Sequence, residues 1–291
     1  MTTLSNSSGF IAPTSLIERF WQNFCVAAAF LTILPLAPLP GSRSGLPADL
    51  GEPVPEDVAD LSPPVEKPGF LARAAGLFPL IGVGIGTCAA LALLASFHIG
   101  LHPLACALIA LAVAALVSGA LHEDGLADFF DGLGGGHTVE QRLTIMSDSR
   151  LGSFGALSLV FATIIRAAIL SGLFSPDTAA LALIAGATVS RATLPGLMRW
   201  LEPVRPGGLG AEAGRPEPTK IALAVLIALV TALLTVGFWG AMSALVAALV
   251  AAALVGFVAR QKLGGQTGDV LGAAQVLAEI AVLAAIAATD Q

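Results

Sequence analysis

The chain has 291 residues, of which 56% are hydrophobic and only 12% charged, and its formal net charge is −6. An average soluble domain carries about 25% charged residues, so this composition excludes an ordinary soluble protein and favours a membrane protein. The acidic balance also argues against a nucleic-acid partner, which would require a basic surface.

Apolar runs of about 20 residues, the length that crosses a bilayer as a helix, recur along the chain. The first run, residues 20–39, is interrupted by prolines and could cross the membrane, re-enter it or lie at its surface. Seven clearer runs follow, at residues 74–97, 103–121, 153–174, 178–198, 221–239, 241–259 and 269–288. They lack the alternation of apolar and polar residues that a membrane β-barrel requires. We therefore predict an all-α polytopic membrane bundle of seven to eight spans, formed by residues 1–291 as a single domain.

Residues 40–69 interrupt this pattern with a segment that is rich in proline and in acidic residues. Such a composition is typical of a solvated loop and not of a packed element. We expect the segment 40–69 to be a loop within the membrane domain, and we assign no function to its carboxylates.

Basic residues are distributed unequally between the two sides of the predicted bundle. The side that carries the loop 122–150 receives eleven of the fourteen Lys and Arg residues, whereas the loops 98–102 and 175–177 and the turn near residue 240 contain none. Lys and Arg concentrate in cytoplasmic loops of membrane proteins. The asymmetry predicts a multi-pass protein of a bacterial inner membrane, with the loops 122–150 and 40–69 in the cytoplasm.

The segment 122–132 reads His-Glu-Asp-Gly-Leu-Ala-Asp-Phe-Phe-Asp-Gly and directly follows an apolar run. In a helix, Asp124, Asp128 and Asp131 would lie within about 60° of one another on one face. Carboxylates so placed repel one another, and a hard divalent cation such as Mg²⁺ would offset that repulsion. We predict a Mg²⁺ site at these three residues at the cytoplasmic face, whereas Glu123 would point elsewhere.

A second polar segment, residues 145–155, lies where the chain re-enters the membrane. It places Asp148 and Arg150 between hydroxyl side chains and before two glycines. Asp148 could be a further metal ligand, and Arg150 could bind a phosphate oxygen. A helix cap with an interfacial anchor explains the same residues equally well.

Two arginines, Arg166 and Arg191, lie inside predicted spans. A charge at that depth is costly, so it is either functional or paired within the bundle. Candidate partners are the aspartates of 122–132, a bound phosphate, and Glu279 in the last apolar run.

Two glycine-rich loops lie on the same predicted side as the aspartates. The loop 264–269 precedes the last apolar run, and its backbone around Gly265, Thr267 and Gly268 could cradle a phosphate. Asp269 at the end of this loop could reach the metal. The other loop contributes Arg205 as a guanidinium for a phosphate.

Five segments taken together resemble the signatures of the cobalamin synthase family (adenosylcobinamide-GDP ribazoletransferase), in order and in separation. These segments are 30–35, 78–82, 122–132, 146–155 and 264–272. The resemblance therefore covers nearly the whole chain. Two features depart from the family pattern: Phe129 and Phe130 replace a smaller pair, and the loop 40–69 is longer than is typical.

The resemblance implies that adenosylcobinamide-GDP reacts with α-ribazole or its 5′-phosphate at a lipid bilayer, giving adenosylcobalamin or its 5′-phosphate and GMP. A ribose hydroxyl would attack the phosphate that bears the cobinamide side chain, and Mg²⁺ and arginines would neutralise the phosphate charges. On this hypothesis the metal ligands are Asp124, Asp128 and Asp131, with Asp148 or Asp269 in addition. The phosphate-binding groups would be Arg150, Arg191, Arg205, Gly265, Thr267 and Gly268. Asp131 or His122 would accept the hydroxyl proton.

Two other functions remain as alternatives. A CDP-alcohol phosphotransferase of phospholipid synthesis shares half of its motif with residues 128–132, but the rest of that motif is missing from residues 133–136 onward. A divalent cation transporter would use the aspartates as an ion site, although these lie at the membrane face and not mid-span. The sequence leaves a homo-oligomer open.

Overall fold

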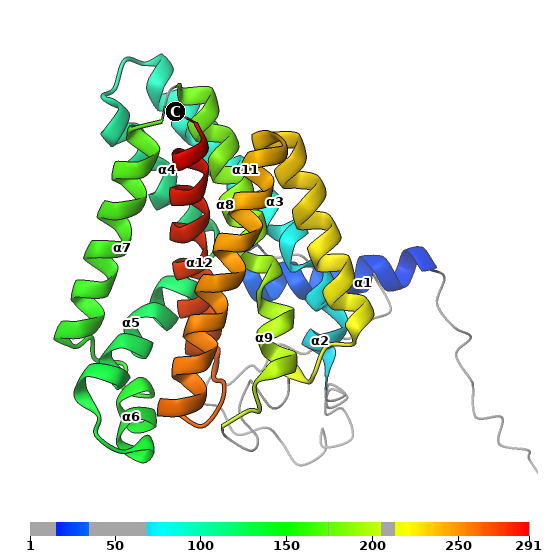
Figure 1. The fold of residues 1–291 in the computed structure, drawn as a ribbon, viewed down its shortest axis with the longest axis vertical. Helices are drawn as coiled ribbons and strands as arrows, with labels where there is room; N and C mark the ends of the chain where they lie inside the picture. The colour runs from blue at the N-terminus through cyan, green and yellow to red at the C-terminus, as the bar shows by residue number, and fades with distance from the viewer. Residues whose placement is uncertain (1–15, 35–68, 174, 205–212, 291) are drawn as a thin grey trace, which may run out of the picture.

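The structure is a computed structural model that describes residues 16–34, 69–173, 175–204 and 213–290 (Figure 1). The predicted loop 40–69, apart from Gly69, and the predicted phosphate ligand Arg205 lie outside the described residues. The helices are α1 (Leu16–Leu31), α2 (Phe70–Ala74), η2 (Ala75–Leu77), α3 (Phe78–His98), α4 (Pro103–Val117), α5 (Leu121–Gly135), α6 (Val139–Met146), α7 (Ser153–Ser171), α8 (Pro176–Ala192), α9 (Leu194–Trp200), α11 (Pro218–Lys262) and α12 (Gly268–Thr289). The described residues contain no strand beyond one isolated bridge, so the all-α prediction is confirmed.

Several helices have the length and apolar composition needed to cross a membrane. Within the described residues, five helical stretches do so: Phe70–His98, Ser153–Ser171, Pro176–Trp200, Pro218–Lys262 and Gly268–Thr289. Large apolar side chains such as Phe161 on α7 and Leu234 and Leu249 on α11 face outward. Such outward apolar surfaces fit a lipid environment and would be unfavourable in water.

The predicted span 103–121 does not run straight through. α4 ends at Val117, and α5 continues at an angle of 93° to it, so the two helices pass the span criterion only as a bent pair. Gly119 and Ala120 both adopt left-handed backbone conformations, with φ of 63° and 55°. Two successive residues of this kind cannot continue a right-handed helix, so they turn α5 away from α4.

The long helix α11 is broken in the middle. Gly237 has φ 69° and ψ −175°, a conformation that only glycine adopts readily. Figure 1 shows α11 as two antiparallel arms that meet in a turn (yellow and orange). The predicted helix pair 221–239 and 241–259 is therefore present, and the turn predicted around residue 240 is found at Gly237.

Small residues allow the central helices to pack closely. A methyl group on Gly82 of α3 would collide with the carbonyl oxygen of Ala187 on α8, and one on Gly86 would lie 2.7 Å from Ile184 Cα. Such contacts between backbones are typical of membrane helices that associate through small side chains. They place α8 at the centre of the bundle, where most of its residues are buried.

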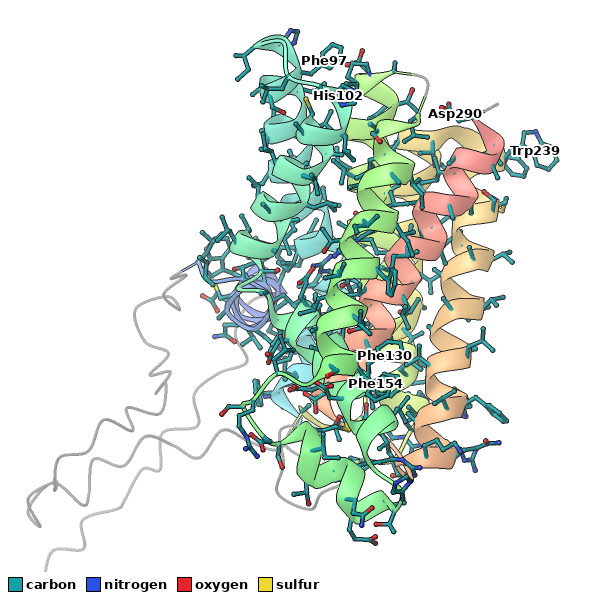
Figure 2. The ribbon with its side chains drawn as sticks, turned by 90° about the vertical axis from the view of Figure 1, so that its left-hand side faces the viewer. Phe97, His102, Phe130, Phe154, Trp239 and Asp290 are labelled. Atoms are coloured by element: carbon teal, nitrogen blue, oxygen red, sulfur yellow. The ribbon has the colours of Figure 1, made fainter. Side chains whose placement is uncertain are left out.

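The two ends of the bundle carry different elements. Figure 2 places His102, Trp239 and Asp290 at one end, together with the α3–α4 turn. The opposite end, here called the α6 end, carries α6, the loop between α11 and α12, and Phe130 and Phe154 (Figures 1 and 2). The Arg142 side chain of α6 donates to the Lys262 carbonyl at 3.1 Å and ties α6 to the end of α11.

Candidate active site

The helix α5 carries the predicted aspartates, and its packing against α12 depends on two glycines. A methyl group on Gly125 would lie 3.0 Å from Asp269 Cα and 3.2 Å from Gly272 Cα. The backbones of α5 and α12 therefore touch at this crossing. The contact brings Asp269, at the start of α12, beside the acidic part of α5.

Four aspartates gather at this crossing. Asp124 is exposed, Asp128 and Asp269 are half-buried, and the negative charges of Asp124, Asp269 and Asp131 all repel the Asp128 carboxylate. Among the described residues, no three His, Cys, Asp or Glu side chains stand close enough together to hold a metal ion by themselves. Mg²⁺ commonly takes one or two carboxylates and completes its shell with water and phosphate oxygens, so this donor set suits it.

The structure directs Asp131 toward α7. It is 7% exposed, and its two carboxylate oxygens accept hydrogen bonds from the backbone N–H groups of Gly152 at 2.7 Å and Gly155 at 2.8 Å. A methyl group on either glycine would collide with this carboxylate. Asp131 thus binds the start of α7, where the unpaired amides and the helix dipole favour a negative charge.

Asp148 and Arg150 form an ion pair in the loop between α6 and α7. The guanidinium Nε donates to both carboxylate oxygens at 3.0 Å, and the backbone N–H of Arg150 donates as well. These hydrogen bonds, from the guanidinium first and the backbone second, lower the pKa of Asp148. Because the Arg150 side chain is 87% exposed, it can also contact a ligand from solvent.

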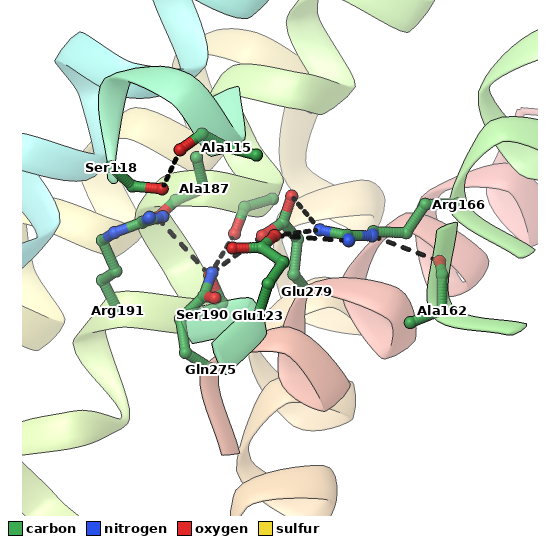
Figure 3. Close-up of polar contacts among 11 residues, drawn as sticks. Ala115, Ser118, Glu123, Ala162, Arg166, Ala187, Ser190, Arg191, Gln275 and Glu279 are labelled. Atoms are coloured by element: carbon green, nitrogen blue, oxygen red, sulfur yellow. Dashed lines mark hydrogen bonds and ion pairs between the residues drawn. The ribbon is translucent and has the colours of Figure 1, made fainter. Parts of the chain in front are cut away.

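A buried polar network lies inside the bundle and joins side chains of α5, α7, α8 and α12. Arg166 of α7 pairs with Glu123 of α5 at 3.3 Å and approaches Glu279 of α12 at 4.0 Å (Figure 3). Gln275 donates to Glu279 at 2.7 Å and to the Ser190 hydroxyl at 2.9 Å. The predicted pairing of an intramembrane arginine with Glu279 is confirmed for Arg166.

The pattern along the chain did not predict the roles of Glu123 and Gln275. Glu123 was set apart from the aspartates only because it points in another direction, and the structure shows that it points to Arg166. Gln275 precedes Glu279 by one helical turn, and this i, i+4 spacing of two polar residues in an apolar run was the available signal.

Two of the predicted catalytic residues, Arg191 and His122, are buried within the bundle, unlike the exposed and half-buried aspartates of the proposed metal site. Arg191 is 3% exposed and donates to the Ala187 carbonyl at 2.9 Å, while its Nε and the Nε2 of His122 are buried without a partner among the described residues. Arg191 lines a cavity of about 10 Å³ together with Glu123 and Gln275. A cavity of that size holds about one water molecule, so Arg191 belongs to the buried network.

The glycine-rich loop before α12 packs against the chain that follows α9. A methyl group on Gly265 would collide with the Glu202 carbonyl, which also accepts the Gln266 N–H at 2.8 Å. The Thr267 side chain caps α12 by accepting the Val270 N–H at 3.3 Å. Gly268 begins the helix and has open space around it. This loop holds three of the predicted phosphate-binding residues. Gly265 is needed for close packing, whereas Thr267 and Gly268 lie at a helix N-terminus suited to an anion.

Comparison with known proteins gives a consistent result. The model of the family described as cobalamin-5-phosphate synthase matches residues 23–287. The chain is 37% identical to the adenosylcobinamide-GDP ribazoletransferase of Bradyrhizobium diazoefficiens over 278 residues, which cover 96% of this chain and 98% of that protein. It is 45% identical over 227 residues to the protein of the same name from Rhizobium johnstonii, covering 75% of this chain and 87% of that protein. No solved structure matches the chain.

Proposed function

The chain belongs to the cobalamin-5-phosphate synthase family, and on that premise we propose how it joins adenosylcobinamide-GDP to α-ribazole or α-ribazole 5′-phosphate with release of GMP. The observation that carries this function is the family match over residues 23–287. It is supported by the adenosylcobinamide-GDP ribazoletransferase of Bradyrhizobium diazoefficiens, which aligns with 96% of the chain. These matches favour the transferase over a CDP-alcohol phosphotransferase and over a cation transporter.

We propose that Asp128, with Asp124 or Asp269 as a second carboxylate ligand, holds Mg²⁺ at the crossing of α5 and α12, where water and phosphate oxygens would complete its shell. The support is electrostatic: Asp124 and Asp269 repel the half-buried Asp128, and a bound cation would relieve that repulsion. When bound, Mg²⁺ would neutralise charge on the diphosphate during displacement. Asp131 would then hold α5 against α7, since both of its oxygens already accept amide hydrogen bonds.

The diphosphate would lie between the aspartates and the groups that start α7 and α12. Arg150 is exposed and is oriented by Asp148, so it would bind a phosphate oxygen while Asp148 fixes its direction. Thr267 and Gly268 would contribute the N-terminus of α12. Arg191 lies in the buried network, where it would support the position of α8 and would not contact the diphosphate. Arg205 stays a proposed phosphate ligand.

Two groups are candidates for accepting the proton of the attacking hydroxyl, Asp131 and His122. Asp131 is better placed, because it contacts Gly152, which follows Arg150 by two residues, and because each of its oxygens keeps a second lone pair beside its amide hydrogen bond. His122 is 4% exposed and lies against the buried network. His122→Ala should therefore retain GMP release, whereas Asp131→Ala should abolish it.

The membrane arrangement extends the same proposal. Among the described residues, Arg142 on α6 and Arg260 and Lys262 at the end of α11 lie at the α6 end, so we place that end and the aspartates in the cytoplasm of a bacterium with the bundle in its inner membrane. Each arm of α11 on either side of Gly237 has about 20 residues, which suffices for a separate crossing. With the bent pair of α4 and α5, this gives seven spans.

The test is GMP release by the purified full-length protein in lipid nanodiscs. We expect release from adenosylcobinamide-GDP only when α-ribazole and Mg²⁺ are both present, and loss of release with a chelator. Asp128→Asn should need more Mg²⁺ for the same rate, whereas the matched variant Asp177→Asn, which changes a carboxylate at the other end of the bundle, should not. Release of CMP from a CDP-alcohol, or Mg²⁺ flux without nucleotide turnover, would overturn the proposal.

A further inference from the structure

A second cavity opens at the surface between α2 and the start of α11. Figure 1 shows these two elements side by side. It has a volume of about 320 Å³, and its charged lining residues are Arg73, Arg215, Lys220 and Glu217. None of these residues belongs to the aspartate cluster or to the buried network. A volume near 300 Å³ is within the range of ligand pockets in proteins.

Close packing between backbones fixes the walls of this cavity. Gly214 adopts φ 79°, and a methyl group on it would collide with Gly69 Cα just before α2. A methyl group on Gly76 would lie 3.1 Å from the Lys220 carbonyl. These contacts hold the last turn of α2, with Arg73, against the first turn of α11, with Lys220.

The cationic side chains that line the cavity differ in whether they already have a partner. The Arg215 Nε donates to the Arg199 carbonyl at 2.7 Å, and its guanidinium pairs with Glu202 at 3.1 Å. Within the part of the chain that the structure describes, the side chains of Arg73 and Lys220 have no hydrogen-bond or ion-pair partner.

The lining of the cavity contains one carboxylate, Glu217, which can offset the charge of only one of these cations. The Glu217 carboxylate accepts a hydrogen bond from the Thr219 hydroxyl at 3.2 Å, and no side chain caps the N-terminus of α11. The partial positive charge of that helix end adds to the two unpaired cations. The cavity therefore presents net positive charge to an anion.

We propose that this cavity binds a phosphate-bearing ligand, either the headgroup of an anionic phospholipid or a phosphate of a substrate. Arg and Lys side chains with a helix N-terminus form a common recognition set for phosphate. The cavity is also linked to the candidate active site, because Glu202 pairs with Arg215 and its carbonyl accepts the Gln266 N–H of the loop before α12. The substrate alternative rests on the proposed function; the binding of phosphate itself does not.

The test compares Arg73→Gln/Lys220→Gln with a matched pair at the end of α11, Arg260→Gln/Lys262→Gln, which removes the same charge outside the cavity. Calorimetric titration with inorganic pyrophosphate, in phosphatidylcholine nanodiscs, reports a substrate-type phosphate. The shift in unfolding temperature between phosphatidylcholine and phosphatidylglycerol nanodiscs reports a headgroup. The charge-preserving variant Arg73→Lys/Lys220→Arg should behave like the parent in both assays.

If the ligand is a substrate phosphate, the cavity variant should bind pyrophosphate about tenfold more weakly than the matched pair, because it has lost two charged donors. If the ligand is a lipid headgroup, stabilisation by phosphatidylglycerol should disappear in the cavity variant alone. Equal behaviour of the two charge-removing variants in both assays would overturn the proposal. Neither assay requires turnover. A protein without transferase activity could therefore still bind phosphate in the cavity, and an active transferase could lack this binding.

Discussion

The carboxylate of Asp131 on α5 accepts a hydrogen bond from the backbone N–H of Gly155, 24 residues away in the first turn of α7, at 2.8 Å. The second oxygen accepts from Gly152 at 2.7 Å. One side chain therefore satisfies two amides that a helix N-terminus leaves open. This polar joint connects the acidic helix α5 to the span α7, in addition to the apolar cluster that holds Phe129 and Ala162.

Gly155→Ala should break this joint. The added methyl group would collide with the Asp131 carboxylate and lie 2.9 Å from the Ala127 carbonyl, neither of which can move freely. We expect a loss of about 1–3 kcal/mol in the free energy of unfolding, measured by denaturation in mixed micelles.

Gly84→Ala on α3 is the matched control. No atom lies within 4 Å of a methyl group at that position, so the substitution should be neutral or stabilising by up to about 1 kcal/mol, as expected for alanine in a helix. Equal stability of the Gly155 and Gly84 variants would show that α5 and α7 do not meet in this way.

Substitution of Asp128 and of Asp131 should separate metal binding from support of the fold. Asp128→Asn removes a carboxylate that its neighbours repel, so stability without Mg²⁺ should stay equal or rise while the Mg²⁺ requirement of the transferase increases. Asp131→Asn places an amide against two N–H donors and should destabilise the protein by about 1–3 kcal/mol.

Thermal unfolding and a Mg²⁺ titration of GMP release, performed on both variants, measure these effects. Loss of stability in the Asp128 variant, or an unchanged unfolding temperature in the Asp131 variant, would contradict the division of roles.

Arg166 and Glu123 should be strongly coupled. Arg166→Met leaves the buried Glu279 and the half-buried Glu123 without their cation, and loss of one partner of a buried ion pair typically costs about 3–5 kcal/mol. Adding Glu123→Gln should recover part of that loss, and the double-mutant cycle should give a coupling of about 1–3 kcal/mol in mixed-micelle unfolding.

The exposed pair of Arg150 and Asp148 provides the comparison for that cycle. The Arg150 side chain is 87% exposed, so water screens the charges and the coupling should be clearly weaker than that between Arg166 and Glu123. Similar coupling in the two cycles would mean that Arg166 is not buried in the protein as it exists in a membrane.

Much of the fold followed from the apolar runs, because a helix that crosses lipid must satisfy its backbone internally and needs a fixed length. The bend between α4 and α5 did not follow, since the apolar run continues through Gly119 and Ala120 and only their backbone conformation reveals the turn. The turn of the α11 hairpin was predicted to within a few residues, but the sequence did not indicate which residue makes it, because Gly237 lies within a uniformly apolar stretch.

The candidate site was predictable only in part. Helical periodicity placed Asp124 and Asp128 on one face, and the structure adds Asp269, as anticipated, because Gly125 lets α12 approach. Periodicity gives the direction of a side chain but not the neighbour that it meets. Asp131 contacts Gly155, which lies 24 residues away in the chain, and Glu123 contacts Arg166, which lies 43 residues away. No local sequence pattern encodes contacts over such separations.

The orientation of the bundle can be tested by cysteine labelling. In a chain whose native cysteines are replaced by alanine, Leu101→Cys in the α3–α4 turn and His137→Cys between α5 and α6 probe opposite ends. Both positions are exposed, so a membrane-impermeant maleimide can reach either one from its own side. If the α6 end is cytoplasmic, spheroplasts should show labelling at position 101 at once and at position 137 only after permeabilisation. Asp177→Cys, in the first turn of α8, should follow position 101. Labelling of position 137 in intact spheroplasts would place the aspartates outside the cytoplasm.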